Sequence, residues 1–381
     1  MKHKRPTRKY HILAFNWQDI THPQSGGAEV HFHEIFKRLA MQGHSVTLAC
    51  CHYPGASKSE RIDSIDVRRY GNRALFNYYV PFAYRQLRRQ GVDIVIDDIN
   101  KIPFYTPCYV KEPVCALVHH LFDKSIYLET NPVSASYVYF SEKLIPLAYR
   151  HTSFAAVSQS TINELRQNGI KGSIHWLPNA VDTNRFPAGK RQKKPLIGYF
   201  GRLKRYKSVE HFLLAIPGII TAMPDAEFVV LGGGDDRQNL EKLTRELQID
   251  SRVIFTGHVS HEDKVDWLGK MWCAVNTSPK EGWGLTVIEA NACGTPVIAA
   301  DSPGLRDSVV NHKTGFLYPY ADIESLSESI IRLCKHPLLL QRMSRHALEW
   351  AIKFDWNRSA EMALEIIERI IYQSNRDGVV Q

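Results

Sequence analysis

The first half of the chain alternates continuous apolar runs with amphipathic helical patterns. One helical pattern follows the first apolar run and ends at Gly43, and its buried face is predicted to consist of Phe32, Ile35, Phe36 and Leu39. Continuous apolar runs that are joined by helices are typical of a parallel sheet covered on both faces. The predicted strands of this sheet are residues 10–17, 44–51, 92–98, 113–120 and 152–158.

The second half repeats the arrangement after a charged, proline-bounded connector at residues 186–195. We therefore expect an α/β fold of two Rossmann-like, doubly wound domains, residues 1–185 and 192–356, which face each other across a cleft. Residues 357–381 contain a last helix that is expected to return to the N-terminal domain. Ligands of such sheets bind at the carboxyl ends of the strands. The predicted strands of the second domain are residues 196–201, 227–233, 252–257, 273–278 and 295–300.

Composition is that of a folded protein with about two domains: 381 residues, 44% hydrophobic and 23% charged. No apolar run approaches the roughly 18 to 20 residues of a membrane helix, and no secretory signal follows the basic first residues. A cytoplasmic location is expected, including the cytoplasmic face of a membrane. The seven cysteines are scattered through apolar runs, as buried free thiols are. His31 and His33 are two residues apart and do not share a helix face, which argues against a zinc site.

Positive charge is concentrated in the first half. Residues 1–190 contain 24 Lys and Arg against 15 Asp and Glu, a surplus of nine, whereas residues 191–381 contain 24 of each. Nucleic acid, an anionic substrate and an anionic membrane surface each explain such an asymmetry.

The stretch SPKEGWGLTVIEANACGTPVIAA, residues 278–300, indicates a binding site. An apolar strand ends before it, and Gly282 and Gly284 precede a short helix predicted from Leu285 to Ala292. Free backbone N–H groups and the helix dipole attract an anion at such a position, so a phosphate is expected there. The two carboxylates nearby, Glu281 on the loop and Glu289 in the helix, suit sugar hydroxyls rather than phosphate. Each of these residues taken alone also has a simpler explanation: the glycines can be turn residues, and each glutamate can be a solvent-exposed residue without a ligand.

This stretch resembles the E-x7-E signature of the retaining glycosyltransferases of family 4, which have the GT-B fold of two Rossmann-like domains. The resemblance covers nearly the whole chain. It implies that Glu289 binds the ribose of a nucleotide-sugar donor and that Glu281 contacts the transferred sugar. The backbone at Gly284, Leu285 and Thr286 is then expected near the donor diphosphate.

Further motifs fit the same resemblance. FGRLKRYKSVE follows a strand and presents Arg202 and Lys207, two cations that can neutralise a diphosphate. Lys204 and Arg205 are interpreted as a solvated basic turn. The resemblance also implies a nucleobase cradle formed by the backbone of Gly257, His258 and Val259.

In the first domain, Gly26 and Gly27 open a helix, and the resemblance places them at the donor phosphate or the acceptor; a plain tight turn is the alternative. His119 and His120 end a strand at the same sheet edge, where a histidine can bond a sugar hydroxyl. The resemblance favours His119, and a buried structural histidine remains the alternative.

Three other motifs lie between or beside the predicted strands. PNAVDTNRF resembles the hinge motif of the family, with Ala180 in place of the usual glycine, and Asp182 alternatively caps a turn. LGGGDD is interpreted as a loop near the cleft. The pairs Asp97–Asp98 and Asp235–Asp236 suggest a metal, but GT-B enzymes use helix dipoles and cations instead, so no metal or other cofactor is expected.

The segment YGNRALFNYYVPFAYRQLRRQG interleaves aromatic residues with arginines. Two interpretations are comparable: a surface for anionic phospholipid, or core aromatics beneath a solvated basic face. Nucleic-acid binding is less favoured, because no nucleic-acid module is recognised. The arginines of this segment are Arg73, Arg85, Arg88 and Arg89.

The leading hypothesis is a retaining hexosyltransferase that uses a UDP- or GDP-sugar and a sugar or lipid-linked acceptor, as in cell-envelope polysaccharide or glycolipid synthesis. One alternative is a nucleotide-sugar 2-epimerase of the same fold, which needs no acceptor. Another is a non-catalytic protein that binds sugar nucleotides.

Overall fold

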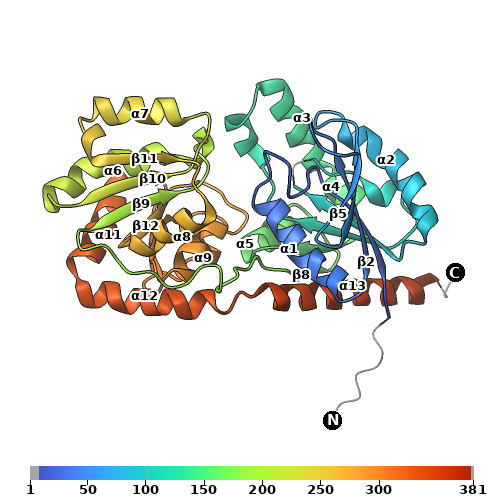
Figure 1. Ribbon diagram of the computed structural model, residues 1–381. Helices are drawn as coiled ribbons and strands as arrows, with labels where there is room; N and C mark the ends of the chain where they lie inside the picture. Colours follow the sequence, from blue (N-terminus) through green and yellow to red (C-terminus); the bar gives the residue numbers. More distant parts are fainter. Residues whose placement is uncertain (1–7, 101, 379–381) are drawn as a thin grey trace, which may run out of the picture. The chain divides into compact units, whose positions relative to one another are not determined.

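The computed structural model describes residues 8–100 and 102–378, and they divide into two compact α/β units (Figure 1). Unit 1 is residues 1–179 and 356–381, and unit 2 is residues 180–355. Both units are built on largely parallel sheets with helices on their faces, which confirms the predicted fold class. From the sequence, the first domain is predicted to end at residue 185, the second to span 192–356 and the returning segment to begin at 357. The structure instead divides the chain after residue 179 and after residue 355.

Within the described part of unit 1, eight strands form one sheet in the order β3-β4-β2-β1-β5-β6-β7-β8. Neighbouring strands are parallel except β3 and β4, which form an antiparallel hairpin at one edge. The strands are β1 His11–Phe15, β2 Ser45–Cys51, β3 Ser59–Ile62, β4 Ile65–Tyr70, β5 Ile94–Ile99, β6 Val114–Val118, β7 Ser153–Ala156 and β8 Ile174–Trp176.

The helices of unit 1 bury one face each against this sheet or against one another. Phe32 and Phe36 of α1 stack with their ring centroids 4.3 Å apart and are buried, as the apolar pattern predicts. The long helix α13 packs beside α1 (Figure 1). The helices are α1 Gly27–Met41, α2 Phe76–Leu87, α3 Pro132–Lys143, α4 Ile145–Ala148, α5 Gln159–Gln167 and α13 Trp356–Gly378, with short 3-10 turns at 88–90, 106–108 and 123–128.

Within the described part of unit 2, six parallel strands form a sheet in the order β11-β10-β9-β12-β13-β14. The strands are β9 Leu196–Phe200, β10 Glu227–Leu231, β11 Val253–Gly257, β12 Cys273–Asn276, β13 Val297–Ala300 and β14 Gly315–Tyr318. The helices are α6 Val209–Ala222, α7 Arg237–Glu246, α8 His261–Lys270, α9 Leu285–Ala292, α10 Leu305–Ser308, α11 Ile323–Lys335 and α12 Pro337–Ala351, with 3-10 turns at 205–207 and 250–252.

All ten predicted strands are present, and the structure adds four: β3, β4, β8 and β14. β3 has the polar sequence SERI at an exposed edge, and β8 has three residues, so neither produces an apolar run. Within the described residues, no helix has both the length and the apolar character to cross a membrane.

Candidate functional site

The loops that follow the strands of unit 2 bring most of the predicted residues to one edge of the sheet. Because β9 to β13 are parallel, their carboxyl ends meet at that edge. The loop after β9 is bonded to the glycine loop after β10, since Leu203 N–H donates to Gly233 O at 2.9 Å. That glycine loop is bonded in turn to the end of β11, where Gly232 N–H donates to Gly257 O at 3.0 Å.

The glycines of LGGGDD are explained by this close packing of loops. A Cβ on Gly232 would lie 2.0 Å from the carbonyl oxygen of Gly201, and one on Gly234 would lie 2.0 Å from that of Leu203. A Cβ on Gly233 would lie 2.5 Å from the His258 ring. The glycine loop therefore supports the segments that carry Arg202 and the predicted nucleobase cradle.

The amino end of α9 has the geometry expected of an anion site. Gly284 is its N-cap, in the left-handed conformation with φ +85°, which glycine adopts without strain. The N–H groups of Leu285 and Thr286 have no acceptor inside the helix, because the helix begins there. Trp283 anchors the loop: it is buried and packs edge-on against Phe354 at 4.7 Å.

Glu281 forms an ion pair with Lys207, and both side chains are mostly buried. Lys207 ends a 3-10 turn after β9, and its carbonyl accepts a hydrogen bond from the Thr277 hydroxyl at 2.9 Å. Burial favours the neutral amine, yet the Glu281 carboxylate raises the pKa of Lys207 above its ordinary value. A fixed positive charge therefore lies beside the loop that leads into α9.

Glu289 is held in a second ion pair that the sequence did not predict. Lys264 of α8 donates to its Oε1 at 3.0 Å, and both side chains are mostly buried. The Lys264 ammonium also lies over the rings of Phe186 and Phe200, at 4.7 and 5.2 Å from their centroids. Three contacts thus fix the lysine, and the lysine fixes one oxygen of the carboxylate.

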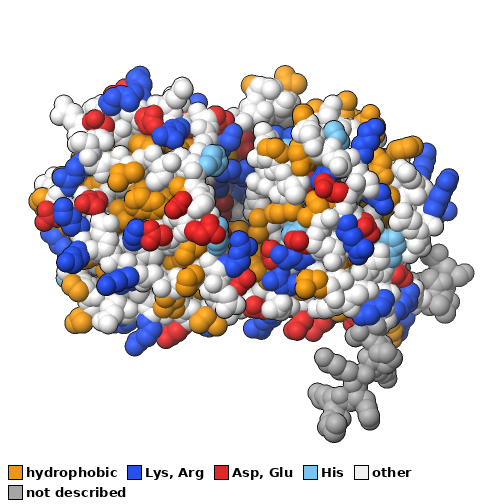
Figure 2. Space-filling view, viewed as in Figure 1, with side chains coloured by type: hydrophobic (Ala, Val, Ile, Leu, Met, Phe, Trp, Pro, Cys, Tyr) orange, Lys and Arg blue, Asp and Glu red, His pale blue; other side chains and the backbone are white. Residues whose placement is uncertain are grey.

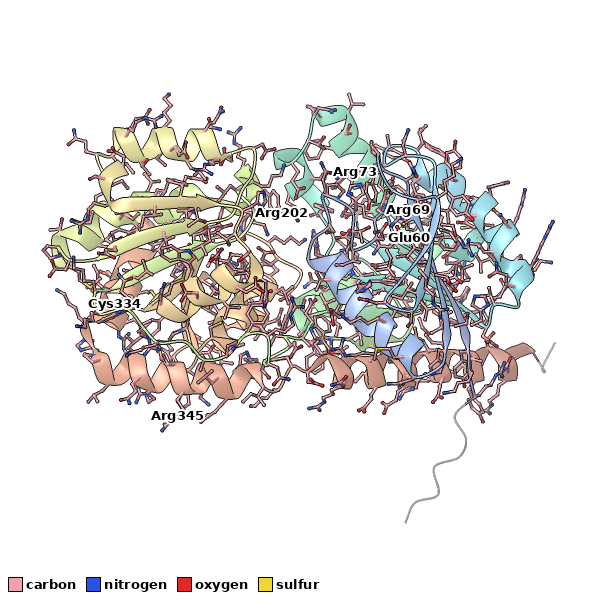
Figure 3. All side chains as sticks on the ribbon, viewed as in Figure 1. Glu60, Arg69, Arg73, Arg202, Cys334 and Arg345 are labelled. Carbon is pink, nitrogen blue, oxygen red and sulfur yellow. The ribbon has the colours of Figure 1, made fainter. Side chains whose placement is uncertain are left out.

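The remaining predicted residues of unit 2 are more exposed. Arg202 is exposed on the loop after β9 (Figure 3), and its carbonyl accepts a hydrogen bond from the Tyr199 hydroxyl. His258 is exposed and Val259 is half-buried, directly after β11. Lys204 and Arg205 agree with the solvated basic turn that the sequence predicts: the Lys204 side chain is 41% exposed and pairs at 2.6 Å with the exposed Asp235.

In unit 1, His119 belongs to a buried hydrogen-bonded network at the ends of β1, β5 and β6. Its Nε2 lies 2.9 Å from Asp98 Oδ1, and Asn16 donates to the other oxygen of Asp98 at 2.7 Å. The His119 carbonyl accepts from the Thr161 hydroxyl at 3.1 Å. Burial raises the pKa of Asp98, and the nearby His119 partly offsets that rise. His120 packs instead against Phe122.

His31 lies beside this network. Its ring meets that of His119 edge-on at 5.1 Å, and its Nε2 lies 3.2 Å from the carbonyl of Leu177. Burial lowers the pKa of His31 well below its ordinary value, so the ring is neutral at pH 7.

The start of α1 is partly capped by its own chain. Glu29 accepts a hydrogen bond from Gly26 N–H at 2.7 Å and another from Asn100 at 2.8 Å. Gly27 is exposed, and a Cβ added there would meet nothing within 4 Å. The structure therefore gives Gly27 no packing reason to be glycine.

The paired aspartates do not share a ligand. Asp97 accepts hydrogen bonds from Tyr149 and Thr106, whereas Asp98 faces Asn16 and His119. Among the described residues, no cluster of three or more His, Cys, Asp or Glu is arranged to hold a metal ion. Asp182 does cap a turn, since its Oδ1 accepts from Asn184 N–H at 3.0 Å.

Two family models together match most of the chain. The model described as Glycosyl transferases group 1 matches residues 180–350, and that described as Glycosyltransferase Family 4 matches residues 25–185. The chain belongs to the family 4 glycosyltransferases. The two matches meet where the chain passes from unit 1 to unit 2.

Curated relatives and solved structures agree with this assignment. A glycogen synthase of Mycobacterium tuberculosis is 28% identical over 218 residues, which cover 56% of this chain and 52% of the relative. A phosphatidyl-myo-inositol mannosyltransferase of Mycobacterium leprae is 22% identical over 364 residues, 91% of this chain and 93% of the relative. The chain thus spans about half the length of the first curated relatives that it matches.

Among solved structures, a sucrose-phosphate synthase from Thermosynechococcus elongatus superposes with a TM-score of 0.82 at 20% identity, covering 96% of this chain and all of the other. Anabaena Alr3699/HepE, solved in complex with UDP and glucose, superposes with a TM-score of 0.75 at 17% identity, covering 94% and 100%. At these identities the likeness shows the GT-B fold alone.

Sequence reasoning about this glycosyltransferase missed Lys264, Asp98 as a partner of His119, and Asn16. Each is brought to the candidate site by a contact that only the fold creates. The one usable signal was the position of Asn16 and Asp98 at the ends of neighbouring parallel strands.

Proposed function

We propose that this protein transfers a sugar from a nucleoside diphosphate sugar to an acceptor hydroxyl, with retention of the anomeric configuration. The observation that carries the proposal is the amino end of α9, where a glycine-capped helix start adjoins two lysine–carboxylate pairs. The helix start suits a diphosphate, and Glu289 suits the hydroxyls of the ribose. The family to which the chain belongs supports the same assignment.

Catalysis then follows from charge development at the leaving diphosphate. The bond between the anomeric carbon and the diphosphate oxygen breaks, and a bond from the acceptor oxygen to that carbon forms. Negative charge grows on the leaving group, so the N–H groups of Leu285 and Thr286 and the cations Lys207 and Arg202 stabilise the transition state more than the ground state. We assign no nucleophile, and the leaving phosphate takes the acceptor proton in a front-face substitution.

His119 and Glu281 are proposed to bind sugar hydroxyls rather than phosphate. Asp98 fixes the His119 ring through Nε2, so the tautomer and orientation of the ring are set before a ligand arrives. Glu281 is held by Lys207 in the same way. Gly26, Gly27, Gly257, His258 and Val259 keep the donor-binding roles that the family resemblance implies.

The donor and acceptor are proposed by class. UDP is the first nucleotide to test, because the similar Anabaena protein was solved with it, and GDP is the second. The acceptor is proposed to be a lipid-linked or otherwise anionic sugar of the cell envelope. The surplus of nine positive charges in residues 1–190 supports this class, and so does the similarity to the phosphatidyl-myo-inositol mannosyltransferase of Mycobacterium leprae.

One experiment separates transfer from the alternatives. Proton NMR of UDP-glucose and GDP-mannose incubated with the protein alone should show slow release of sugar with the anomeric configuration of the donor. A 2-epimer of the donor would identify an isomerase. Binding of UDP or GDP without any turnover, with or without added acceptors, would identify a binding protein.

Substitutions test the roles proposed for Glu289 and Arg202. Glu289→Ala should raise the dissociation constant of the nucleotide, because the ribose loses its acceptor, and Arg202→Ala should mainly lower turnover. Glu262→Ala and Arg205→Ala alter exposed charges on α8 and on the same loop, so they serve as matched controls. If Glu289→Ala and Arg202→Ala match their controls in both measurements, the site assignment is wrong.

A further inference from the structure

Large hydrophobic side chains are exposed on two neighbouring helical segments of unit 1. Along α2 and just before it, exposed side chains alternate with buried ones, so the interpretation as core aromatics holds for only some of these residues. Phe76, Val80 and Tyr84 are in the core, whereas Tyr78 and Phe82 are 67% and 61% exposed. The exposed members on this segment and on α3 and α4 are Leu75, Tyr78, Tyr79, Phe82, Val133, Tyr137, Phe140, Leu144 and Leu147.

The two segments form one surface. Asn77 of α2 donates to the hydroxyl of Tyr137 of α3 at 3.0 Å. Burial and a hydrogen bond with the Tyr78 hydroxyl raise the pKa of Tyr137 to about 12, which again places α2 beside α3. Figure 2 shows hydrophobic side chains along the upper edge of unit 1, over α2 and α3, with Lys and Arg side chains at its outer end. We call this surface, with the nine residues above, the α2–α3 face.

The charge around the α2–α3 face is positive. Residues 67–92 contain six arginines and no Asp or Glu, and Arg73, Arg85 and Arg89 among them are exposed. The one acidic residue of α3, Glu142, is buried and accepts hydrogen bonds from the backbone N–H groups of Phe122 and Asp123. Neither α2 nor α3 therefore carries an exposed acid; the exposed Glu129 lies just before α3, and the exposed Lys124 and Lys143 outnumber it there.

We propose that the α2–α3 face docks on the surface of an anionic lipid bilayer. Aromatic and aliphatic side chains enter the boundary between headgroups and acyl chains, and the arginines bind the anionic headgroups. A second copy of the chain fits less well, because a two-fold contact through this face brings arginines toward arginines. The proposal concerns a different surface from the nucleotide site and does not depend on the proposed transfer reaction.

Vesicle flotation tests the proposal on the full chain. Wild-type protein should float with vesicles of phosphatidylcholine and phosphatidylglycerol and remain largely unbound with phosphatidylcholine alone. Each arginine near an anionic surface contributes about fivefold to partitioning. Arg85→Gln/Arg89→Gln should therefore lower the partition coefficient about 25-fold, and Phe82→Ala/Phe140→Ala should lower it about tenfold or more.

Matched controls lie on unit 2. Arg342→Gln/Arg345→Gln removes two exposed arginines of α12, of which Arg345 is labelled in Figure 3. Leu338→Ala/Ile352→Ala removes two exposed aliphatic side chains. Both pairs should float as the wild type does. Equal loss in the controls, or equal flotation with neutral vesicles, would overturn the proposal. So would a wild-type dimer in sedimentation that dissociates on Phe82→Ala/Phe140→Ala, since the face would then be an interface between copies.

Discussion

Replacing Gly284 by alanine tests the geometry at the start of α9. The residue has φ +85°, where a non-glycine residue costs about 1–2 kcal/mol. An alanine Cβ would also lie 2.9 Å from Ser308 Oγ, 3.0 Å from Leu305 Cδ2 and 3.2 Å from Val287 Cγ2. Crowding of this kind costs about 1–3 kcal/mol, so Gly284→Ala should lower the free energy of unfolding by about 2–5 kcal/mol.

Gly294 at the other end of α9 provides the control. Its φ is +80°, but its Cβ would meet only Leu348, at the ordinary distance of 3.7 Å. Gly294→Ala should therefore cost only the backbone contribution, about 1–2 kcal/mol. Urea titration followed by circular dichroism measures the free energy of unfolding of both variants. Titration with UDP measures their nucleotide dissociation constants.

The two variants should differ in nucleotide binding as well as in stability. Gly284→Ala moves the N–H groups of the first turn, so UDP affinity should fall at least tenfold, whereas Gly294→Ala should bind as the wild type does. Equal stability losses in the two variants would refute the crowding argument. Unchanged UDP affinity in Gly284→Ala would refute the assignment of the phosphate site.

Three further predictions concern other groups. Lys264→Met removes a charge-assisted hydrogen bond of about 1.5–3 kcal/mol, so Glu289 loses its orientation and the nucleotide dissociation constant should rise about tenfold in calorimetry; an unchanged constant would show that the lysine is only structural. Asp98→Asn should lower turnover about tenfold without changing nucleotide affinity, because it loosens His119 in the other unit; normal turnover would remove His119 from the mechanism. The depressed pKa of His31 means that the unfolded chain gains a proton below about pH 6.5 that the folded chain does not. This proton makes stability fall as the pH falls, by up to about 1.4 kcal/mol per pH unit. His31→Gln should remove that contribution from the slope measured by urea titration at pH 7.0 and 5.5 and leave what the lowered pKa values of His44, His175 and His211 add; an identical slope in the variant would contradict the burial argument.

The part of the site that the sequence predicts is the part carried by local chain geometry. A strand that ends at Asn276, glycines at 282 and 284 and a helix that stops before Gly294 are all short-range features, and the structure confirms α9 at Leu285–Ala292. The family match confirms the class of protein in the same way, because it depends on the same motifs.

The contacts that sequence could not predict join segments far apart in the chain. Lys264 lies 25 residues before Glu289, and in HEDKVDWL it has the pattern of a solvated helix residue. Its role follows only from the packing of α8 against Phe186 and Phe200. Whether the aromatic residues of α2 are buried or exposed could not be predicted for a related reason. A helix with apolar residues on two faces does not reveal from sequence which face packs against the rest of the protein.

That the protein requires no metal also stays a prediction. In the proposed site a helix start together with Lys207 and Arg202 neutralises the diphosphate, so sugar transfer is expected to proceed unchanged in excess EDTA. Activity that EDTA abolishes and Mg²⁺ or Mn²⁺ restores would show that these cations are insufficient.

The most direct measurement is a crystal structure of the protein with UDP. Diphosphate oxygens should lie within hydrogen-bonding distance of the N–H groups of Leu285 and Thr286, and ribose hydroxyls should donate to the Glu289 oxygen that Lys264 does not contact. A nucleotide bound elsewhere, or a Glu289 carboxylate that still contacts only Lys264 in the complex, would contradict it.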